Sequence, residues 1–220
     1  MISITTLSEL TIDGKLTLGA GASSKDLFDF YGDDLRSWFH AERARHDAIM
    51  VGAGTVRSDD PELTVRHAPG SNPLRVIPSS DGKLPLDARL LNDGNRTLVA
   101  VSDETSDSVV AGLRAKPGVE VVRCGSGRVD LVKLMGQLED RGVRSLVAEG
   151  GSQLLRALFD ANIVTRIIIK HIPVITGAIG AATYLGEALP AFGLSRWKVE
   201  DVFQLGGVPV TIYVPIMRDL

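Results

Sequence analysis

The sequence predicts an α/β fold in which helices flank one mixed, mostly parallel sheet that ends in an antiparallel hairpin. Segments rich in β-branched residues alternate with amphipathic segments through most of the chain, as expected when helices cover the faces of a parallel sheet. Three strand-like segments then follow one another near the C-terminal end, which favours antiparallel pairing there. The 220 residues, 44% of them hydrophobic, can bury a sizeable core, and we expect a single domain over residues 1–220.

A long helix is expected near the N-terminal end. It covers 25–44, with Ser23 or Ser24 as its N-cap, and Gly32 weakens it in the middle. Its apolar face at helical spacing comprises Leu27, Tyr31, Leu35, Trp38 and Phe39.

The remaining elements alternate along the chain. Strands are predicted by compact apolar or β-branched segments over 2–7, 47–52, 73–80, 96–102, 119–124, 144–151, 164–173, 198–206 and 208–217. Helices are predicted by amphipathic segments over 103–116, 129–142 and 152–162. The Asp-Gly pair at Asp13 predicts a turn after the first strand, and Gly142 is expected in the C′ position of its helix.

The composition narrows the possible partners and the compartment. A net charge of −3 gives no overall attraction to nucleic acid or to an anionic membrane, so any phosphate binding must be local. The lone Cys124 excludes an internal disulfide and a multi-cysteine metal site. No apolar segment of the sequence approaches the roughly 20 residues needed to span a bilayer, and the N-terminal segment does not resemble a signal peptide. We therefore expect a cytoplasmic protein that binds neither nucleic acid nor membranes.

Glycine-rich segments after predicted strands are candidate phosphate sites. Segments 52–57 and 125–130 each supply Gly-x-Gly without the third glycine of a dinucleotide-binding fingerprint, so ordinary turns are favoured there. In VAEGGSQLL (147–155) a strand leads into Glu149 and a glycine pair before a helix begins. Free N–H groups at that helix start favour a phosphate, and an ordinary strand–helix turn is an equal alternative.

Segment VGAGTVRSDDPELTVR (51–66) combines glycines, paired aspartates and two arginines. Asp59 and Asp60 before a proline are typical of a structural turn, and without a histidine partner at useful spacing they predict no metal site. Arg66 could pair with a phosphate or be an ordinary solvated arginine. His40 is expected to pack within its helix. No metal-ligand spacing relates the four histidines, His40, His46, His67 and His171.

Six segments occur in a characteristic order and spacing. They are TIDGKL (11–16), ARHDAIMVGAGTVRSDDPELTVR (44–66), NPLRVIPSS (72–80), PLDARLL (85–91), VEVVRCGSGRVDL (119–131) and VAEGGSQLL (147–155). Together they resemble the pyrimidine reductases of riboflavin biosynthesis in their stand-alone form, a module that is also the C-terminal domain of bifunctional deaminase-reductases. The string Gly-x-Gly-Thr-Val-x-x-Asp-Asp-Pro-x-Leu-Thr-Val-Arg (52–66) is the most specific part of this resemblance.

The resemblance implies a dihydrofolate-reductase-like fold, a homodimer, and NADPH as the cofactor. It implies reduction of a ribosylamino-pyrimidine 5′-phosphate to its ribitylamino form, with hydride passing from the nicotinamide to C1′ of the ring-opened sugar. The protein aligns the reactants and anchors their phosphates. Open alternatives are a diaminopyrimidinone or an aminouracil base, NADPH or NADH, a pterin-like or secondary-metabolite substrate, and a non-catalytic NADPH sensor.

The resemblance also assigns candidate site residues. Thr55 and Asp59 are expected near the nicotinamide, Ser79 near the adenosine, and the helix start after Gly151 at the pyrophosphate. The full set of cofactor contacts is expected to be Lys25, Thr55, Asp59, Ser79, Gly150, Gly151, Ser152, Gln153 and Leu154. Substrate contacts are expected from Ser23, Arg43, Leu63, Arg66 and Glu149, with the two arginines on the phosphate. The proton could come from Glu149, Asp59 or water.

Three departures from the family pattern accompany the resemblance. Glu9 and Leu10 stand where small residues are usual, Pro78 stands where aspartate is usual, and Val174 stands where lysine is common. Val174 is expected near the site, so the presence of valine instead of lysine bears on which substrate is bound.

Overall fold

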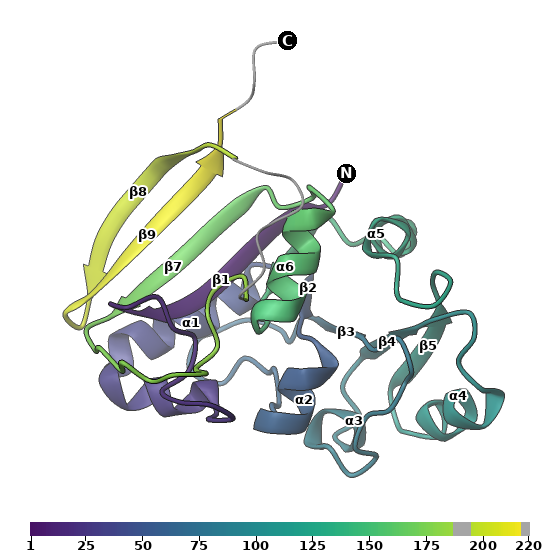
Figure 1. Ribbon diagram of the computed structural model, residues 1–220. Coiled ribbons are helices and arrows are strands. Elements are labelled where there is room, and N and C mark those ends of the chain that lie inside the picture. Colours follow the sequence, from purple (N-terminus) through teal and green to yellow (C-terminus); the bar gives the residue numbers. More distant parts are fainter. Residues whose placement is uncertain (187–194, 217–220) are drawn as a thin grey trace.

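The computed structural model describes residues 1–186 and 195–216, which form a sheet with helices on both faces (Figure 1). The nine strands are β1 (Ser3–Thr11), β2 (Ala48–Met50), β3 (Leu74–Pro78), β4 (Thr97–Val101), β5 (Val119–Arg123), β6 (Ser145–Ala148), β7 (Arg166–Ile172), β8 (Trp197–Leu205) and β9 (Val208–Pro215). Their order across the sheet is β5-β4-β3-β2-β6-β1-β7-β9-β8.

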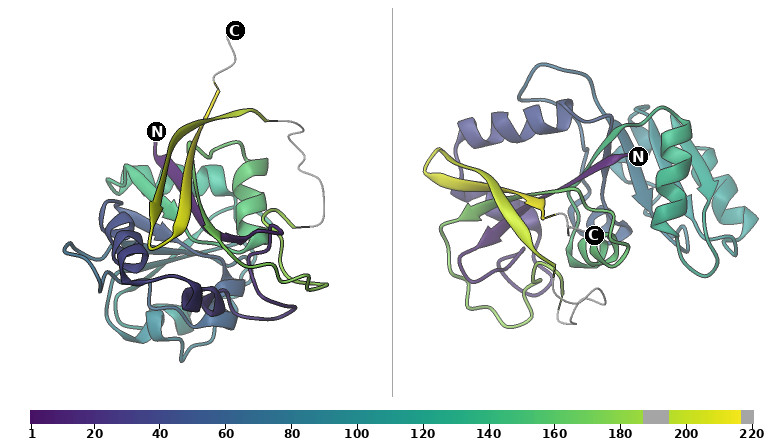
Figure 2. Two further views of the ribbon diagram at one scale, coloured as in Figure 1. Left: turned by 90° about the vertical axis from the view of Figure 1, so that its left-hand side faces the viewer. Right: turned by 90° about the horizontal axis from the view of Figure 1, so that it is seen from above.

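The strand directions confirm the predicted fold class. Neighbouring strands from β5 across to β7 pair in parallel, whereas β9 is antiparallel to both β7 and β8. Every residue of β2 and β4 is buried, as expected for parallel strands covered on both faces. The final hairpin of β8 and β9 extends beyond the helices (Figures 1 and 2). Most side chains of its edge strand β8 are exposed.

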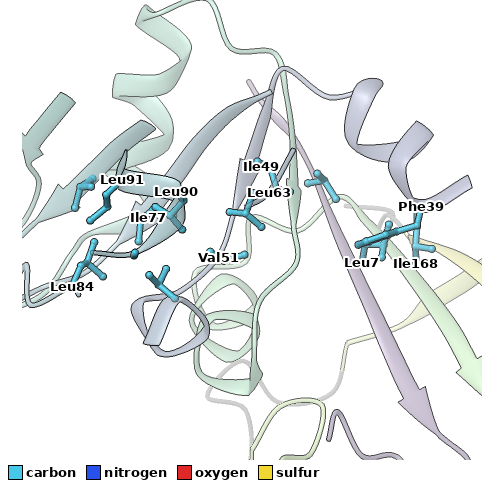
Figure 3. Packing of buried hydrophobic residues seen from close by; sticks show 14 of the residues in the cluster. Leu7, Phe39, Ile49, Val51, Leu63, Ile77, Leu84, Leu90, Leu91 and Ile168 are labelled. Carbon is cyan, nitrogen blue, oxygen red and sulfur yellow. The ribbon is translucent and has the colours of Figure 1, made fainter. Parts of the chain in front are cut away.

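Two hydrophobic cores lie on opposite faces of the sheet. The helices are η1 (Ser24–Phe30), α1 (Asp33–Ala44), α2 (Ala53–Asp59), α3 (Arg89–Asn92), α4 (Asp107–Arg114), α5 (Leu131–Asp140) and α6 (Ser152–Asp160). The larger core packs under η1 and α1–α4, and the smaller under α5 and α6. Within β2, Ile49 belongs to the larger core and its neighbours Ala48 and Met50 to the smaller, which follows from the two-residue period of a strand. Figure 3 shows the larger core extending from Leu7 and Phe39 to Leu91. No described helix is long and apolar enough to cross a membrane.

The single helix predicted over 25–44 is wrong, because the segment forms two helices. Ser23 is the N-cap of η1, and its hydroxyl accepts a hydrogen bond from the Lys25 N–H group. Gly32 has an extended backbone and is the N-cap of α1, whose first turn contains Asp33 and Asp34. Acidic residues stabilise the positive end of a helix dipole, so Gly32 marks a new helix start.

Two further expectations need correction. Segment 52–57, for which an ordinary turn was favoured, instead begins α2 (Ala53–Asp59), which ends where Asp60 adopts a left-handed backbone with φ 40°. Asp60 therefore has the predicted turn role. The helix expected over 103–116 begins only at Asp107, with Ser106 as its N-cap, because a turn closed by the Thr105 N–H to Ser102 carbonyl bond precedes it. Gly142, with φ 85°, follows the C-cap of α5 as predicted.

Replacing Leu98 by alanine should destabilise the protein strongly. Leu98 lies in β4, is fully buried and belongs to the smaller core, so its truncation removes transfer free energy and leaves a cavity. We expect a loss of about 2–5 kcal/mol in the free energy of unfolding, measured by urea denaturation. Leu86→Ala is the control, because Leu86 is 47% exposed and should change stability by no more than about 0.5 kcal/mol. Equal effects of the two substitutions would contradict this packing.

Candidate functional site

A cleft of about 1340 Å³ opens at the carboxyl ends of the central parallel strands. Its walls come from β1 and from the segments that follow β2, β3 and β6. Strand β6 pairs with β1 only as far as Thr6, whereas β1 continues to Thr11 beside β7 alone. One edge of β1 is therefore open over 7–9, and these residues border the cleft. The carboxyl edge of an open α/β sheet is where ligands bind in such folds.

Nearly all residues predicted for the site line this one cleft. Its glycine-rich wall comprises 52–55, 79–81 and 150–154, and its charged wall comprises Leu7, Ser8, Glu9, Phe39, Arg43, Leu63, Arg66 and Glu149. Lys25 and Asp59 also line the cleft. Of the predicted residues, Ser23 does not line it directly, but its hydroxyl donates to Asp59 Oδ1 at 2.9 Å.

Asp59, the last residue of α2, is held by the start of η1. Its Oδ1 accepts from Ser23 Oγ at 2.9 Å and its Oδ2 accepts from Ser24 Oγ at 3.0 Å. Lys25 Nζ donates to the Asp59 backbone carbonyl, and the Asp59 residue as a whole is only 8% exposed. The carboxylate is thus fixed by two hydroxyl donors, and η1 is tied to the cleft.

Arg43 and Glu149 form a buried bidentate ion pair in the charged wall. Arg43 Nε donates to Glu149 Oε1 at 2.8 Å and Nη2 to Oε2 at 2.7 Å. Arg43 Nη1 donates to the Thr64 carbonyl at 3.1 Å, and the guanidinium lies 4.4 Å from the Phe39 ring centre. Burial alone would lower the pKa of Arg43, but the pairing with Glu149 raises it above its ordinary value. Two residues predicted as separate substrate contacts are therefore one unit.

A second ion pair, between Glu9 and Lys170, lies beside the first. Lys170 in β7 is fully buried, its Nζ contacts the Glu9 carboxylate, and it lies 3.8 Å from the Phe39 ring centre. Tyr31 Oη donates weakly to Glu9 Oε1 at 3.5 Å. Burial lowers the pKa of Lys170, and Glu9 opposes that shift. Sequence reasoning missed Lys170, although a lysine inside the apolar segment RIIIKHI was the available signal.

His40 anchors the segment that carries Arg66. The Arg66 N–H group donates to His40 Nδ1 at 3.1 Å, and the His67 ring packs edge-on against His40 at 4.7 Å. Burial, with Arg43, His67 and Arg66 nearby, lowers the pKa of His40 to about 4. His40 is therefore neutral at neutral pH and accepts through Nδ1. It is buried as predicted, and this hydrogen bond adds a role that the sequence did not indicate.

Arg66 is positioned as a half-exposed cation at the rim of the charged wall. Its side chain is 46% exposed and contacts the Glu62 carboxylate, with Nη1 donating to Thr64 Oγ1 at 2.6 Å. Further cations that sequence reasoning missed also line the cleft, namely Arg57, Arg89 and Arg128. A cleft-lining arginine has no sequence pattern that separates it from a solvated one.

Unpartnered hydroxyls in the cleft wall indicate a polar ligand. Ser8 Oγ and Ser79 Oγ are buried and lack a hydrogen-bond partner among the described residues, and both residues line the cleft. Buried polar groups are normally hydrogen-bonded. The start of α6 adds free N–H groups, with Gly151 as its N-cap. Within the described part of the chain, no three His, Cys, Asp or Glu side chains are arranged to hold a metal ion.

Comparison with known proteins gives sequence relatives over most of the chain. The family model described as the RibD C-terminal domain matches residues 3–208. The 2,5-diamino-6-ribosylamino-4(3H)-pyrimidinone 5′-phosphate reductase of Aquifex aeolicus is 40% identical, over 82% of this chain and 80% of its own length. The protein of the same name from Archaeoglobus fulgidus is 38% identical, over 91% of this chain and 93% of its own length.

Solved structures share the architecture. A pyrimidine reductase-like protein from Corynebacterium diphtheriae has a TM-score of 0.80 at 20% identity, covering 98% of this chain and 92% of that one. Dihydrofolate reductase from Enterococcus faecalis has a TM-score of 0.50 at 14% identity, covering 97% and 96%. At such identities the likeness establishes the fold alone, and it confirms the expected dihydrofolate-reductase-like fold.

Replacing His40 by glutamine should weaken the pH dependence of stability between pH 6.5 and 4. A histidine in the unfolded chain has a pKa of about 6.5 and binds a proton below that pH. His40 in the folded protein has a pKa of about 4 and does not bind this proton until the pH falls further. Folding stability therefore falls as pH drops through this window, by on the order of 3 kcal/mol for this group. Urea unfolding at pH 7.5 and 4.5 should show a smaller loss in His40→Gln than in the unsubstituted protein. An equal loss in both would contradict a neutral, accepting His40.

Proposed function

The chain belongs to the family of the RibD C-terminal domain, and on that basis we propose that it is a nicotinamide-dependent reductase of a ribosylamino-pyrimidine 5′-phosphate in riboflavin biosynthesis. The product is the ribitylamino form of the same phosphate. One observation carries the proposal. A single cleft joins a glycine-rich wall at a helix start to a wall of buried charges, so two unlike ligands can meet there.

The glycine-rich wall fits the cofactor. Free N–H groups at the start of α6 would hold the pyrophosphate, where Gly151 has room for close approach because a Cβ there would meet only Thr55 Oγ1, at 3.9 Å. The unpartnered hydroxyl of Ser79 would gain a partner at the adenosine end. When bound, the dinucleotide supplies the hydride that reduces C1′ of the sugar.

We propose NADPH rather than NADH as the reductant. Arg128 and Ser79 both line the cleft. It lies in a loop held against the end of β3 by the hydrogen bond from the Val129 N–H group to Ser80 Oγ, at 3.1 Å. Together with Arg57, another cleft-lining cation, it supplies positive charge that suits the extra phosphate.

The charged wall fits the phosphorylated sugar and its base. Arg66, half-exposed at the rim, would hold the 5′-phosphate. For Arg43 we propose a role other than the expected phosphate contact, because its guanidinium already donates to Glu149 and to the Thr64 carbonyl. We propose that Arg43 orients Glu149 and the segment that ends in Arg66, and that Glu149 contacts the pyrimidine or the sugar.

We propose water as the proton source for the reduced imine nitrogen. Both oxygens of Asp59 accept hydrogen bonds from serine hydroxyls, and both oxygens of Glu149 accept from Arg43. Oxygens held in this way by donors face the ligand as hydrogen-bond acceptors, so we do not assign either carboxyl group as the acid. Asp59 and Glu149 would then stabilise positive charge on the imine while a water molecule gives up the proton.

Three further expectations accompany this function. We propose one reductase domain over residues 1–220, since a single sheet runs through the described residues. We propose a homodimer, and the exposed edge strand β8 with its exposed Val199 and Val202 supports it. We propose the cytoplasm as the compartment, because the lone, buried Cys124 forms no disulfide.

A turnover assay tests the proposed function. Purified protein should oxidise NADPH when given the diaminopyrimidinone or the aminouracil ribosylamino 5′-phosphate, and it should turn over NADH more slowly. Absence of NADPH oxidation with both pyrimidines would refute the proposal. Activity on dihydropterins instead would select the pterin-like alternative.

Arg66→Ala should separate substrate binding from cofactor binding. Loss of a charge-assisted hydrogen bond to a phosphate costs about 1.5–3 kcal/mol, so we expect the substrate KM to rise at least roughly tenfold. The Kd of NADPH, measured by fluorescence titration, should stay nearly unchanged. Arg141→Ala is a matched control, because Arg141 forms an ion pair with Glu120 and is absent from the cleft walls. An unchanged KM in Arg66→Ala would contradict its phosphate role.

The two adjacent glycines before α6 should respond differently to alanine. A Cβ on Gly150 would lie 2.7–3.0 Å from three atoms of Leu154, so Gly150→Ala should lower the free energy of unfolding by about 1–3 kcal/mol. Gly151→Ala should fold normally but raise the Kd of NADPH, because its methyl group enters the space at the helix start. Normal NADPH affinity in a well-folded Gly151→Ala protein would contradict the proposed pyrophosphate site.

A further inference from the structure

The Glu9 carboxylate has one free oxygen in the cleft wall. Its Oε1 contacts Lys170 Nζ and accepts weakly from Tyr31 Oη, whereas Oε2 accepts no hydrogen bond from any residue that the structure describes. The side chain is 13% exposed and lies on the open edge of β1, where β6 no longer pairs. Glu9 therefore offers an accepting oxygen to whatever occupies the charged wall.

Stability does not account for the Glu9–Lys170 pair. Lys170 is fully buried, and removing such a charge from water costs about as much as the ion pair returns. Replacing a buried ion pair by apolar residues of similar size is often neutral or stabilising, and the surroundings of Lys170 include the Tyr31 and Phe39 rings. What Lys170 does accomplish is to fix the carboxylate in one place, and fixed polar groups in a ligand cleft select among ligands.

The neighbouring carboxylates are more fully hydrogen-bonded than Glu9. Both oxygens of Glu149 accept from Arg43, and both oxygens of Asp59 accept from the hydroxyls of Ser23 and Ser24. Of these three carboxylates, Glu9 is the one with an oxygen that accepts no hydrogen bond from the described residues. A ligand group that meets it must donate hydrogen bonds, because a carbonyl oxygen facing a carboxylate is repelled.

The two candidate bases differ in the hydrogen-bonding groups that they would present to Glu9. The diaminopyrimidinone presents an amino group at C2 beside the ring N3–H, two adjacent donors. The aminouracil presents a carbonyl oxygen at C2 instead. Resting on the proposed function, we propose that Glu9, positioned by Lys170, accepts hydrogen bonds from the amino edge of the base and makes the enzyme selective for the form that still carries the 2-amino group. Deamination of the base then follows the reduction.

Kinetics with both pyrimidine phosphates test this selectivity. The unsubstituted enzyme should have a kcat/KM at least tenfold higher for the diaminopyrimidinone than for the aminouracil. In Glu9→Gln the amide can donate to the C2 carbonyl, so the preference should fall below about threefold, mainly through KM. Glu120→Gln, on an exposed ion pair in β5, is the matched control and should keep the preference.

Glu9→Gln leaves the buried Lys170 without its ion-pair partner. Two further measurements therefore test the selectivity without relying on the folding of this single variant. The double variant Glu9→Gln, Lys170→Met removes both charges and should lose the preference in the same way. Inhibition of the unsubstituted enzyme by the sugar-free bases should favour 2,5,6-triamino-4-pyrimidinone over 5,6-diaminouracil by at least tenfold. Activity on neither phosphate would refute the proposed function itself. Equal efficiency on both, equal inhibition by both bases, or an unchanged preference in folded Glu9 variants would overturn only the role of Glu9.

Discussion

The buried ion pair between Arg43 and Glu149 determines the form of the charged wall. It joins α1 to the end of β6, and through the Thr64 carbonyl it also holds the segment that leads to Arg66. Burying two charges is costly unless their hydrogen-bonding groups are satisfied. Here the bidentate geometry, a third acceptor and the Phe39 ring meet that need, so three separate parts of the chain are fixed around one guanidinium.

The sheet explains why the charges gather in one place. Apolar side chains form a core on each face of the sheet, and most of the charged groups that line the cleft follow the carboxyl ends of strands or lie in helices. Because β6 stops while β1 continues, the open edge of β1 brings Glu9 into the same wall as Glu149. The glycine-rich wall includes the N-terminus of α6. One cleft thus offers a backbone-rich surface to a dinucleotide and a charged surface to a second ligand.

Much of the fold could be predicted from the sequence, because local patterns decide it. Apolar segments located the strands, and Ser23 and Gly142 marked a helix start and a helix end. The break at Gly32 was missed because apolar periodicity continues across it, and α2 was missed because its glycines suggest a turn. The resemblance named residues that do gather in the cleft. It could not reveal that Arg43 and Glu149 neutralise each other or that Lys170 lies under Glu9, since such pairs join residues more than a hundred positions apart.

Transfer of deuterium from stereospecifically labelled NADPH to the sugar carbon tests most directly whether the cleft aligns the two proposed ligands. NADPH deuterated at either face of C4 is incubated with the protein and the ribosylamino-pyrimidine phosphate, and the product is analysed by mass spectrometry and NMR. A cleft with fixed walls presents one face of the nicotinamide, so one of the two labelled cofactors should place a single deuterium at C1′ of the ribityl chain. A product without deuterium at C1′, or with label from both cofactors, would contradict the proposed arrangement.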